Sequence, residues 1–324
     1  MYYTIRHTTR FRYSAPISES ITEVRFQPRS EGNQHCMDFH LHTSPRAQIM
    51  SYRGEFGNRV HHFDIPNSHT QLTITAESLV DVTAPPSLPD ALDELAWNAL
   101  DSLTATDDYW DTLMPSHFAS PTDLLDELAR ELDVRRRGDP LTNLRELCGA
   151  LYRTFGYALK TTHVDSPIDE ALRLRKGVCQ DFAHIMITLV RHYLHIPCRY
   201  VSGYLLHKEH GQERSSSDAM HAWVEAYFPN LGWVGFDPTN NTLPDERHVR
   251  VAVGRDYADV TPMHGVYKGK AKSELVVIIR FALSEVTFSD DSPIEPEWMP
   301  SSHEEDDRDQ VQHQIIPQPQ QQQQ

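Results

Sequence analysis

The chain has 324 residues, of which 39% are hydrophobic, and its formal net charge is −16. This length accommodates one large domain or two ordinary ones, with a core that needs no disulfide framework. The acidic balance argues against a nucleic-acid partner and against binding to anionic membranes, because both reward clustered cations.

The four cysteines of the chain are far apart and form no Cys-x-x-Cys pair, which favours reduced thiols in a chain of this size. The first residues alternate like a strand and lack the apolar stretch of a signal peptide. No run approaches the roughly 20 apolar residues needed to span a bilayer. We therefore expect a cytoplasmic protein, and the sequence leaves its oligomeric state open.

Residues 1–82 are predicted to form an all-β domain. Alternation places one set of side chains on a single face of the first segment, namely Tyr3, Ile5, His7, Thr9, Phe11 and Tyr13. Shorter alternating runs follow at 24–26, 39–41 and 72–76, separated by turns rich in Gly, Asn and Pro. This pattern indicates a small β-sandwich or a barrel-like domain.

Residues 83–120 open with a proline-rich break and are predicted to connect the β-rich domain to a catalytic core at 121–288. In that core, 120–123 and 139–140 carry the N-cap and first-turn proline signals of two helices. A third helix is predicted from about residue 179 to 194.

Strands are expected over 199–206, 222–228 and 233–237, and the apolar run 275–283 is expected to be a further core strand. Helices that lead into antiparallel strands predict an α+β fold. Residues 289–324 are acidic and then glutamine-rich, and they are predicted to be a disordered tail.

A cysteine, a histidine and an aspartate stand at the edges of these elements: Cys179, His221 and Asp237. Cys179 begins the third helix, where the positive end of the helix dipole favours a thiolate. If the strands on either side of 229–232 form a hairpin, the histidine and the aspartate lie at comparable distances from its turn. A lone cysteine is equally compatible with simple packing, but these partners favour a nucleophile, a base and an orienting carboxylate.

Two histidine pairs could suggest a metal instead. His192 and His195 share a helix face, and His207 and His210 form a His-x-x-His sequence. Neither pair has a carboxylate or a thiol at ligand spacing, and no acidic loop has the spacing of calcium ligands. We therefore predict no metal site and no cofactor.

Several separate motifs resemble, in order, the core of bacterial transglutaminase-like proteins. They are RKGVCQD at 175–181, RYVSGY at 199–204, HAWVE at 221–225 and GWVGFDPTN at 232–240, and the similarity continues at 254–260. Upstream, 11–14 and 56–60 resemble the β-rich N-terminal domain that accompanies this core. The resemblance covers roughly 1–285.

The resemblance implies a papain-like fold in which Cys179 is the nucleophile, His221 the general base and acid, and Asp237 the orienting carboxylate. It implies a cysteine-dependent acyl transfer from a carboxamide or peptide bond of a peptide or protein substrate. The thioester is then resolved by water, which we favour, or by an amine. The alternative is a catalytically silent scaffold that binds other proteins.

The same resemblance implies an oxyanion hole whose first donor is the backbone N–H of the nucleophile. Three further residues are candidates for substrate binding or for the second donor: Tyr157, Gln180 and Trp223. For the tryptophan, packing within the strand core is the competing interpretation.

Overall fold

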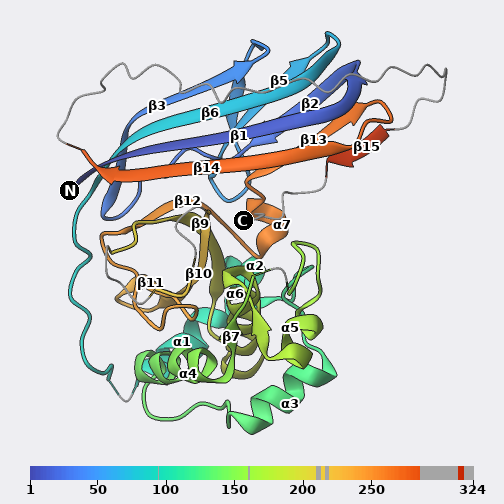
Figure 1. Ribbon diagram of the computed structural model, residues 1–324. Coiled ribbons are helices and arrows are strands. Elements are labelled where there is room, and N and C mark those ends of the chain that lie inside the picture. Colours follow the sequence, from blue (N-terminus) through green and yellow to red (C-terminus); the bar gives the residue numbers. More distant parts are fainter. Residues whose placement is uncertain (94, 160, 209–212, 216–218, 285–312, 317–324) are drawn as a thin grey trace.

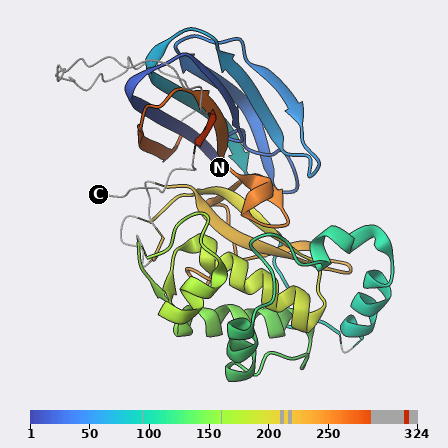
Figure 2. The same ribbon diagram turned by 90° about the vertical axis from the view of Figure 1, so that its right-hand side faces the viewer.

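The computed structural model describes residues 1–93, 95–159, 161–208, 213–215 and 219–284, together with the backbone of 313–316. A β-sandwich lies on one side of the molecule and a mixed domain of helices and strands on the other (Figure 1). A perpendicular view shows the same division (Figure 2). Among the described residues, no helix combines the length and the apolar character that crossing a membrane requires.

Two antiparallel sheets form the sandwich. The strands of one follow the order β14-β1-β6-β3, and those of the other the order β15-β13-β2-β5-β4. The N-terminal part of the chain contributes β1 (Tyr2–Ile17), β2 (Glu19–Val24), β3 (Gln34–Ser44), β4 (Met50–Arg53), β5 (Arg59–Ile65) and β6 (His69–Val82). The C-terminal part contributes β13 (Met263–Lys268), β14 (Ser273–Leu283) and β15 (His313–Ile316).

The alternation predicted for the first strand is confirmed. All six side chains on its inward face are at most 4% exposed, and the residues between them are partly exposed. The period of two therefore places one row of β1 in the sandwich core, as expected for a strand with one buried face.

The placement of the last strands corrects the expected domain limits. The run at 275–283 forms a strand, but β14 pairs with β1 along its whole length and β13 pairs with β2. Both strands therefore belong to the sandwich and not to a core at 121–288. β14 is also an edge strand, with Val276 46% and Ile278 41% exposed, so its continuous apolar run does not mark a buried core strand.

Within the predicted tail, the backbone of 313–316 forms β15, which pairs with β13. The rest of that prediction lies outside the described residues. The predicted connection at 83–120 runs down from the sandwich to α1 (Ala96–Thr104) (Figure 1). It also contains a short 3₁₀ turn, Asp107–Tyr109, and α2 (Trp110–Leu113).

The helices begin close to where the capping signals predict, although Pro121 precedes the N-cap of the first one and does not lie in its first turn. Thr122 caps α3 (Asp123–Glu131) by accepting a hydrogen bond from the Leu125 N–H. Asp139 caps α4 (Pro140–Thr154), and its carboxylate accepts from two backbone N–H groups of the first turn. Such caps satisfy donors that have no partner within the helix.

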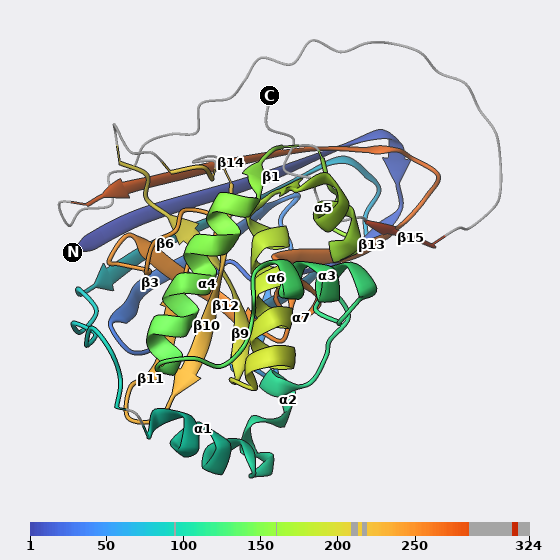
Figure 3. The ribbon, with the colours of Figure 1, turned by 90° about the horizontal axis from the view of Figure 1, so that it is seen from below.

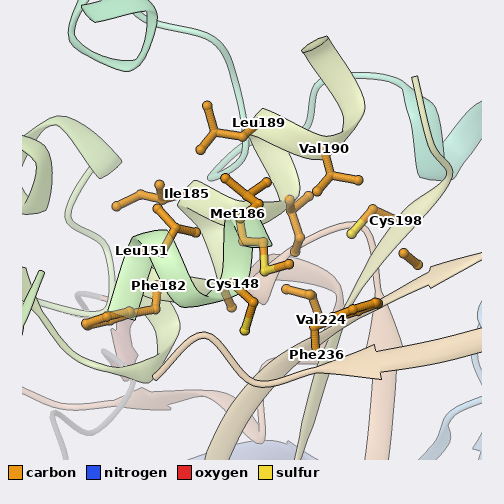
Figure 4. Close-up of a cluster of buried hydrophobic side chains, with 14 of the residues drawn as sticks. Cys148, Leu151, Phe182, Ile185, Met186, Leu189, Val190, Cys198, Val224 and Phe236 are labelled. Carbon is orange, nitrogen blue, oxygen red and sulfur yellow. The ribbon is translucent and has the colours of Figure 1, made fainter. Parts of the chain in front are cut away.

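The catalytic-core region is completed by α5 (Ile168–Leu174), α6 (Cys179–Leu189) and α7 (Tyr257–Val260). A π-helical turn, Val190–Leu194, extends α6 to the predicted end of the third helix. Viewed from below, α4 and α6 lie over one side of the second sheet, and α3 and α5 lie next to α6 (Figure 3). α6 is buried along almost its whole length, and its side chains pack with those of α4 and of the second sheet (Figure 4).

The second sheet has the order β11-β10-β9-β12 and is antiparallel throughout. Its strands are β9 (Cys198–Leu205), β10 (His221–Phe228), β11 (Gly232–Phe236) and β12 (His248–Gly254). The expected hairpin is present, because β10 and β11 pair from Val224–Phe236 to Phe228–Gly232. A short parallel pair, β7 (Gly156–Tyr157) and β8 (Lys176–Gly177), lies just before α6.

Two carboxamides from the sandwich cover the outer edge of this sheet at β12. Asn58 donates to the Val253 carbonyl at 2.7 Å and accepts from the Val253 N–H at 2.9 Å. Gln34 makes the same pair of bonds to Arg250, at 2.9 and 2.8 Å. An edge strand has unpaired backbone groups, so these side chains act as partners for β12 and fix the sandwich against it.

Gly203 of β9 provides a test of this packing. A Cβ atom there would lie 2.2 Å from the Val249 carbonyl oxygen and 2.5 Å from the Trp223 ring. We expect Gly203→Ala to lower the free energy of unfolding by about 1–3 kcal/mol, as overpacked cores do. Urea unfolding would measure the change, with Gly54→Ala as the control because its nearest neighbour would be 3.7 Å away. Equal stability of the two variants would contradict this packing.

Candidate active site

Cys179 is the first residue of α6, and the loop that precedes it is tightly held. The Val178 N–H and the Thr162 hydroxyl both donate to Asp181 Oδ2, at 2.8 and 2.7 Å. Gly177 leaves room for this arrangement, since a Cβ atom there would lie 2.5 Å from the same oxygen. The cysteine itself is partly exposed, so a reactant can approach it at the positive end of the helix dipole.

His221 and Asp237 meet as the hairpin predicts. The imidazole Nε2–H donates to Asp237 Oδ2 at 2.7 Å, and both side chains are at most 1% exposed. His221 is the first residue of β10, and Asp237 directly follows β11. The hairpin register therefore joins two residues that are 16 positions apart in the chain.

The Asp237 carboxylate is held by its own turn. Its Oδ1 accepts from the N–H groups of Thr239 and Asn240, at 3.0 and 3.2 Å. The Asn240 carboxamide donates to Oδ2 at 2.8 Å. Asn240 belongs to the motif at 232–240, but the sequence assigns it no role. Its side chain reaches the aspartate only because the turn folds back.

Opposite charges tune the pair. Burial lowers the pKa of His221, but the Asp237 carboxylate more than offsets this effect and, with the Cys179 thiol, raises that pKa to about 10. Burial by itself would raise the pKa of Asp237, yet the His221 imidazolium holds that pKa well below the usual range. Because Nε2 is committed to the aspartate, Nδ1 is the nitrogen left to exchange a proton with the thiol. At neutral pH the ring is therefore an imidazolium next to a sulfur.

The three accessory candidates behave differently from one another. Trp223 is only 1% exposed and packs with Val201 and Val253, so it belongs to the core and does not line a surface that substrate can reach. The Gln180 carboxamide donates to the Val164 carbonyl at 2.9 Å and thus fastens the start of α6. Tyr157 of β7 lies beside Gly177 in register, two residues from Cys179, and its role remains a prediction.

A further histidine was missed in the sequence. His248 begins β12, and its Nε2 lies 3.5 Å from Asp237 Oδ2, the oxygen that is also bonded to His221. No spacing rule points to it, because the two strands that carry these histidines are brought together only by β9 between them.

His221, Asp237 and His248 together offer two imidazole nitrogens and a carboxylate oxygen within 4.8 Å, a donor set that zinc accepts. Ligands at 2.0–2.1 Å from a tetrahedral metal lie about 3.3 Å apart. The 2.7 Å between His221 and Asp237 is shorter and is the length of a charge-assisted hydrogen bond. The geometry is that of a proton relay.

The other histidine pairs lie elsewhere. His192 and His195 line a pocket of about 420 Å³ between the end of α6 and the segment around α2, beside Arg136 and Arg191. His207 is half-buried, and its expected partner His210 lies outside the described residues.

Comparison with known proteins places the chain in a family. It matches the description "Bacterial transglutaminase-like N-terminal region" over residues 3–81 and "Transglutaminase-like superfamily" over 126–238. An uncharacterized protein of Mycobacterium leprae is 31% identical over 84% of this chain and 95% of its own length. The chain belongs to the bacterial transglutaminase-like proteins. An uncharacterized protein of Mycobacterium tuberculosis is 34% identical over 85% of this chain and 90% of that one.

Two further similarities concern fold and core. A crystal structure from Cytophaga hutchinsonii, described provisionally as a cysteine protease, has a TM-score of 0.65 at 22% identity and covers 93% of this chain and 94% of that one. A protein-glutamine gamma-glutamyltransferase of Pseudomonas aeruginosa is 31% identical over 29% of this chain and 15% of its own length. The predicted α+β fold, a papain-like transglutaminase core preceded by an all-β domain, is confirmed.

The buried pair predicts a pH-dependent stability. Since the pKa of His221 is raised from 6.5 to about 10, its contribution is full below about pH 6.5 and is lost as the pH rises to 10. Since the pKa of Asp237 is lowered, its contribution is full above about pH 4, the usual aspartate value. We expect the loss of unfolding free energy in Asp237→Asn to be greatest between about pH 4 and 6.5.

Urea unfolding of both proteins from pH 4 to 10 would measure this difference. Asp101→Asn serves as the control, because it breaks an ion pair with Arg136 in which Asp101 is 54% exposed and should change stability little. A loss in Asp237→Asn that stays constant across the pH range would contradict the assigned charges.

Proposed function

We propose that this protein is a cysteine-dependent acyl-transfer enzyme with Cys179, His221 and Asp237 as its catalytic residues. The observation that carries the proposal is the partly exposed Cys179 at the start of a buried helix, whose thiol interacts with the imidazole of His221, which is itself locked to a buried carboxylate. Family membership supports a cysteine enzyme. The substrate class that fits is a peptide or protein with a carboxamide or a peptide bond.

In the first half-reaction, the Cys179 thiolate attacks the carbonyl carbon and the carbonyl π bond opens to an oxyanion. The backbone N–H of Cys179, at the helix start, is the first donor to that oxyanion. The intermediate collapses as His221 gives its proton to the leaving nitrogen. The products are a thioester on the sulfur and a released ammonia or amine.

In the second half-reaction, His221 is neutral and takes a proton from water or from a primary amine as that nucleophile attacks the thioester. Collapse restores the Cys179 thiolate and gives a carboxylic acid with water or a new amide with an amine. Asp237 keeps the same ring nitrogen protonated throughout, so Nδ1 always faces the sulfur. Both outcomes use the same residues, and only the second nucleophile differs.

The state of the sulfur can be tested with iodoacetamide. We expect Cys179 to be carboxyamidomethylated selectively at pH 6–7, because the His221 imidazolium favours thiolate. Cys36 is an internal control, since burial raises its pKa to about 11. In His221→Ala the rate at Cys179 should fall about tenfold or more, because an ordinary thiol is only a few per cent ionised at pH 7.

Peptide mapping by mass spectrometry would give the rate at each cysteine separately. Alkylation of Cys179 no faster than that of N-acetylcysteine at the same pH, and unaffected by His221→Ala, would contradict an activated nucleophile.

Activity and its outcome can be measured in one experiment. Wild type and Cys179→Ala would be incubated with a library of glutamine-containing peptides and a fluorescent primary amine. Incorporated label indicates amine transfer, whereas ammonia or a new amino terminus without label indicates hydrolysis. We expect one of these signals in wild type and its loss, by at least about a thousandfold, in the variant. Wild type that is indistinguishable from Cys179→Ala would overturn the proposal in favour of a silent scaffold.

A further inference from the structure

His248 lies at the same end of the second sheet as His221. Residues of the intervening strand β9 pair with both, His221 with Gly203 and His248 with Leu205. The two imidazoles therefore approach the Asp237 carboxylate from opposite sides of β9. The same oxygen, Oδ2, is 2.7 Å from His221 Nε2 and 3.5 Å from His248 Nε2.

Nε2 of His248, the ring nitrogen that faces Asp237, makes no other interaction among the described residues. The side chain is 1% exposed, and its Nε2 has no hydrogen-bond partner among the residues that the structure describes. A buried polar atom without a partner is costly. The nearest carboxylate oxygen is the one that orients the candidate base, so a small movement of the ring would complete a hydrogen bond to it.

The outer nitrogen of His248 anchors the ring. The Asp245 N–H donates to Nδ1 at 3.2 Å, and Asp245 Oδ1 lies 3.1 Å from the same atom. Asp245 is fixed in turn by Arg247 at 2.9 Å, and Arg247 also pairs with Glu213 at 2.6 Å. The ring is thus held from behind by a network of ionised side chains.

These contacts decide where the proton lies. With a backbone N–H bonded to Nδ1, a neutral ring carries its proton on Nε2. In the charged ring, Nδ1–H donates to Asp245 Oδ1 and Nε2 is again protonated. The remaining tautomer would set a nitrogen lone pair against the Asp237 carboxylate and is disfavoured. A donor therefore faces Asp237 Oδ2.

Trp223 keeps the two histidines apart at a fixed spacing. Its indole stacks at an angle of 29° on the His221 ring, with centroids 6.0 Å apart, and lies edge-on to His248 at 5.3 Å. Gly203 lets the indole lie across β9, because a Cβ atom there would collide with the ring. The tryptophan thus braces both imidazoles.

We propose that His248 is a positioning residue that helps to hold the Asp237 carboxylate against His221 from the side of β12. The inference rests on the proposed function for its catalytic consequence, but its structural part stands alone. Without His248, Oδ2 keeps His221 and the Asn240 carboxamide as partners but loses its neighbour on the side of β12. A small misplacement in an active site can cost up to about a hundredfold in rate.

Two substitutions separate positioning from packing. His248→Leu removes the donor at similar size, whereas His248→Gln can keep an N–H near the position of Nε2. The matched control is His61→Leu, since His61 is a buried histidine of the sandwich whose Nδ1 also has no partner among the described residues.

The first measurement does not depend on enzymatic activity. With isotope-labelled histidine, the proton between His221 Nε2 and Asp237 gives a downfield resonance in the proton NMR spectrum. We expect it to be lost or broadened in His248→Leu and kept in His248→Gln and His61→Leu. The second measurement is the iodoacetamide rate at Cys179, which should fall about 10- to 100-fold in His248→Leu and recover most of the loss in His248→Gln.

An unchanged resonance in His248→Leu, or an equal loss in the Leu and Gln variants, would overturn the positioning role. Failure of the proposed function looks different, because wild-type Cys179 would then show no enhanced alkylation although the resonance still responds to His248. Should His248→Leu fail to fold, Asp245→Asn weakens the anchor with little change in shape. Asp245→Asn should then lower the iodoacetamide rate at Cys179 by a smaller factor, about threefold. An unchanged rate would count against the proposal.

Discussion

The ion pair between His221 and Asp237 is the interaction on which the rest of the site depends. Two charges removed from water stabilise a fold only if their geometry and their remaining hydrogen bonds compensate for desolvation. Here the Asp237 turn supplies backbone donors and Asn240 supplies a side-chain donor. These donors keep the Asp237 carboxylate in place, and the carboxylate keeps the His221 imidazole charged. The charge next to Cys179 therefore depends on them.

The β-rich domain takes part in this arrangement at a distance. Asn58 and Gln34 serve as backbone-like partners for the edge strand β12. β12 in turn carries His248 to the carboxylate. The sandwich is therefore built into the wall of the site, and a loss of these carboxamide contacts would release the strand that supports Asp237.

Local signals predicted much of the molecule. Caps at Thr122 and Asp139 marked helices, and alternation in β1 marked the sandwich core, because these depend on neighbours in sequence. The hairpin also predicted that His221 meets Asp237. The sequence could not reveal His248, since its place depends on which strands β9 pairs with, and for Trp223 it left core packing and substrate binding open. The strand at 275–283 was assigned to the wrong domain because its partner β1 is remote in sequence.

The return of β13 and β14 to the sandwich has a consequence for how the protein is made. Tyr13 pairs with Ser273 and Tyr3 with Leu283, so β1 finds this neighbour only after the helices and the second sheet have been synthesised. At about 5–20 residues per second, a separation of this length means a delay on the order of 15–50 s. During that interval one flank of β1 lacks its native partner, while the helices and second sheet encoded between the two strands can already assemble. The half of the molecule that is synthesised first is thus the half that is completed last.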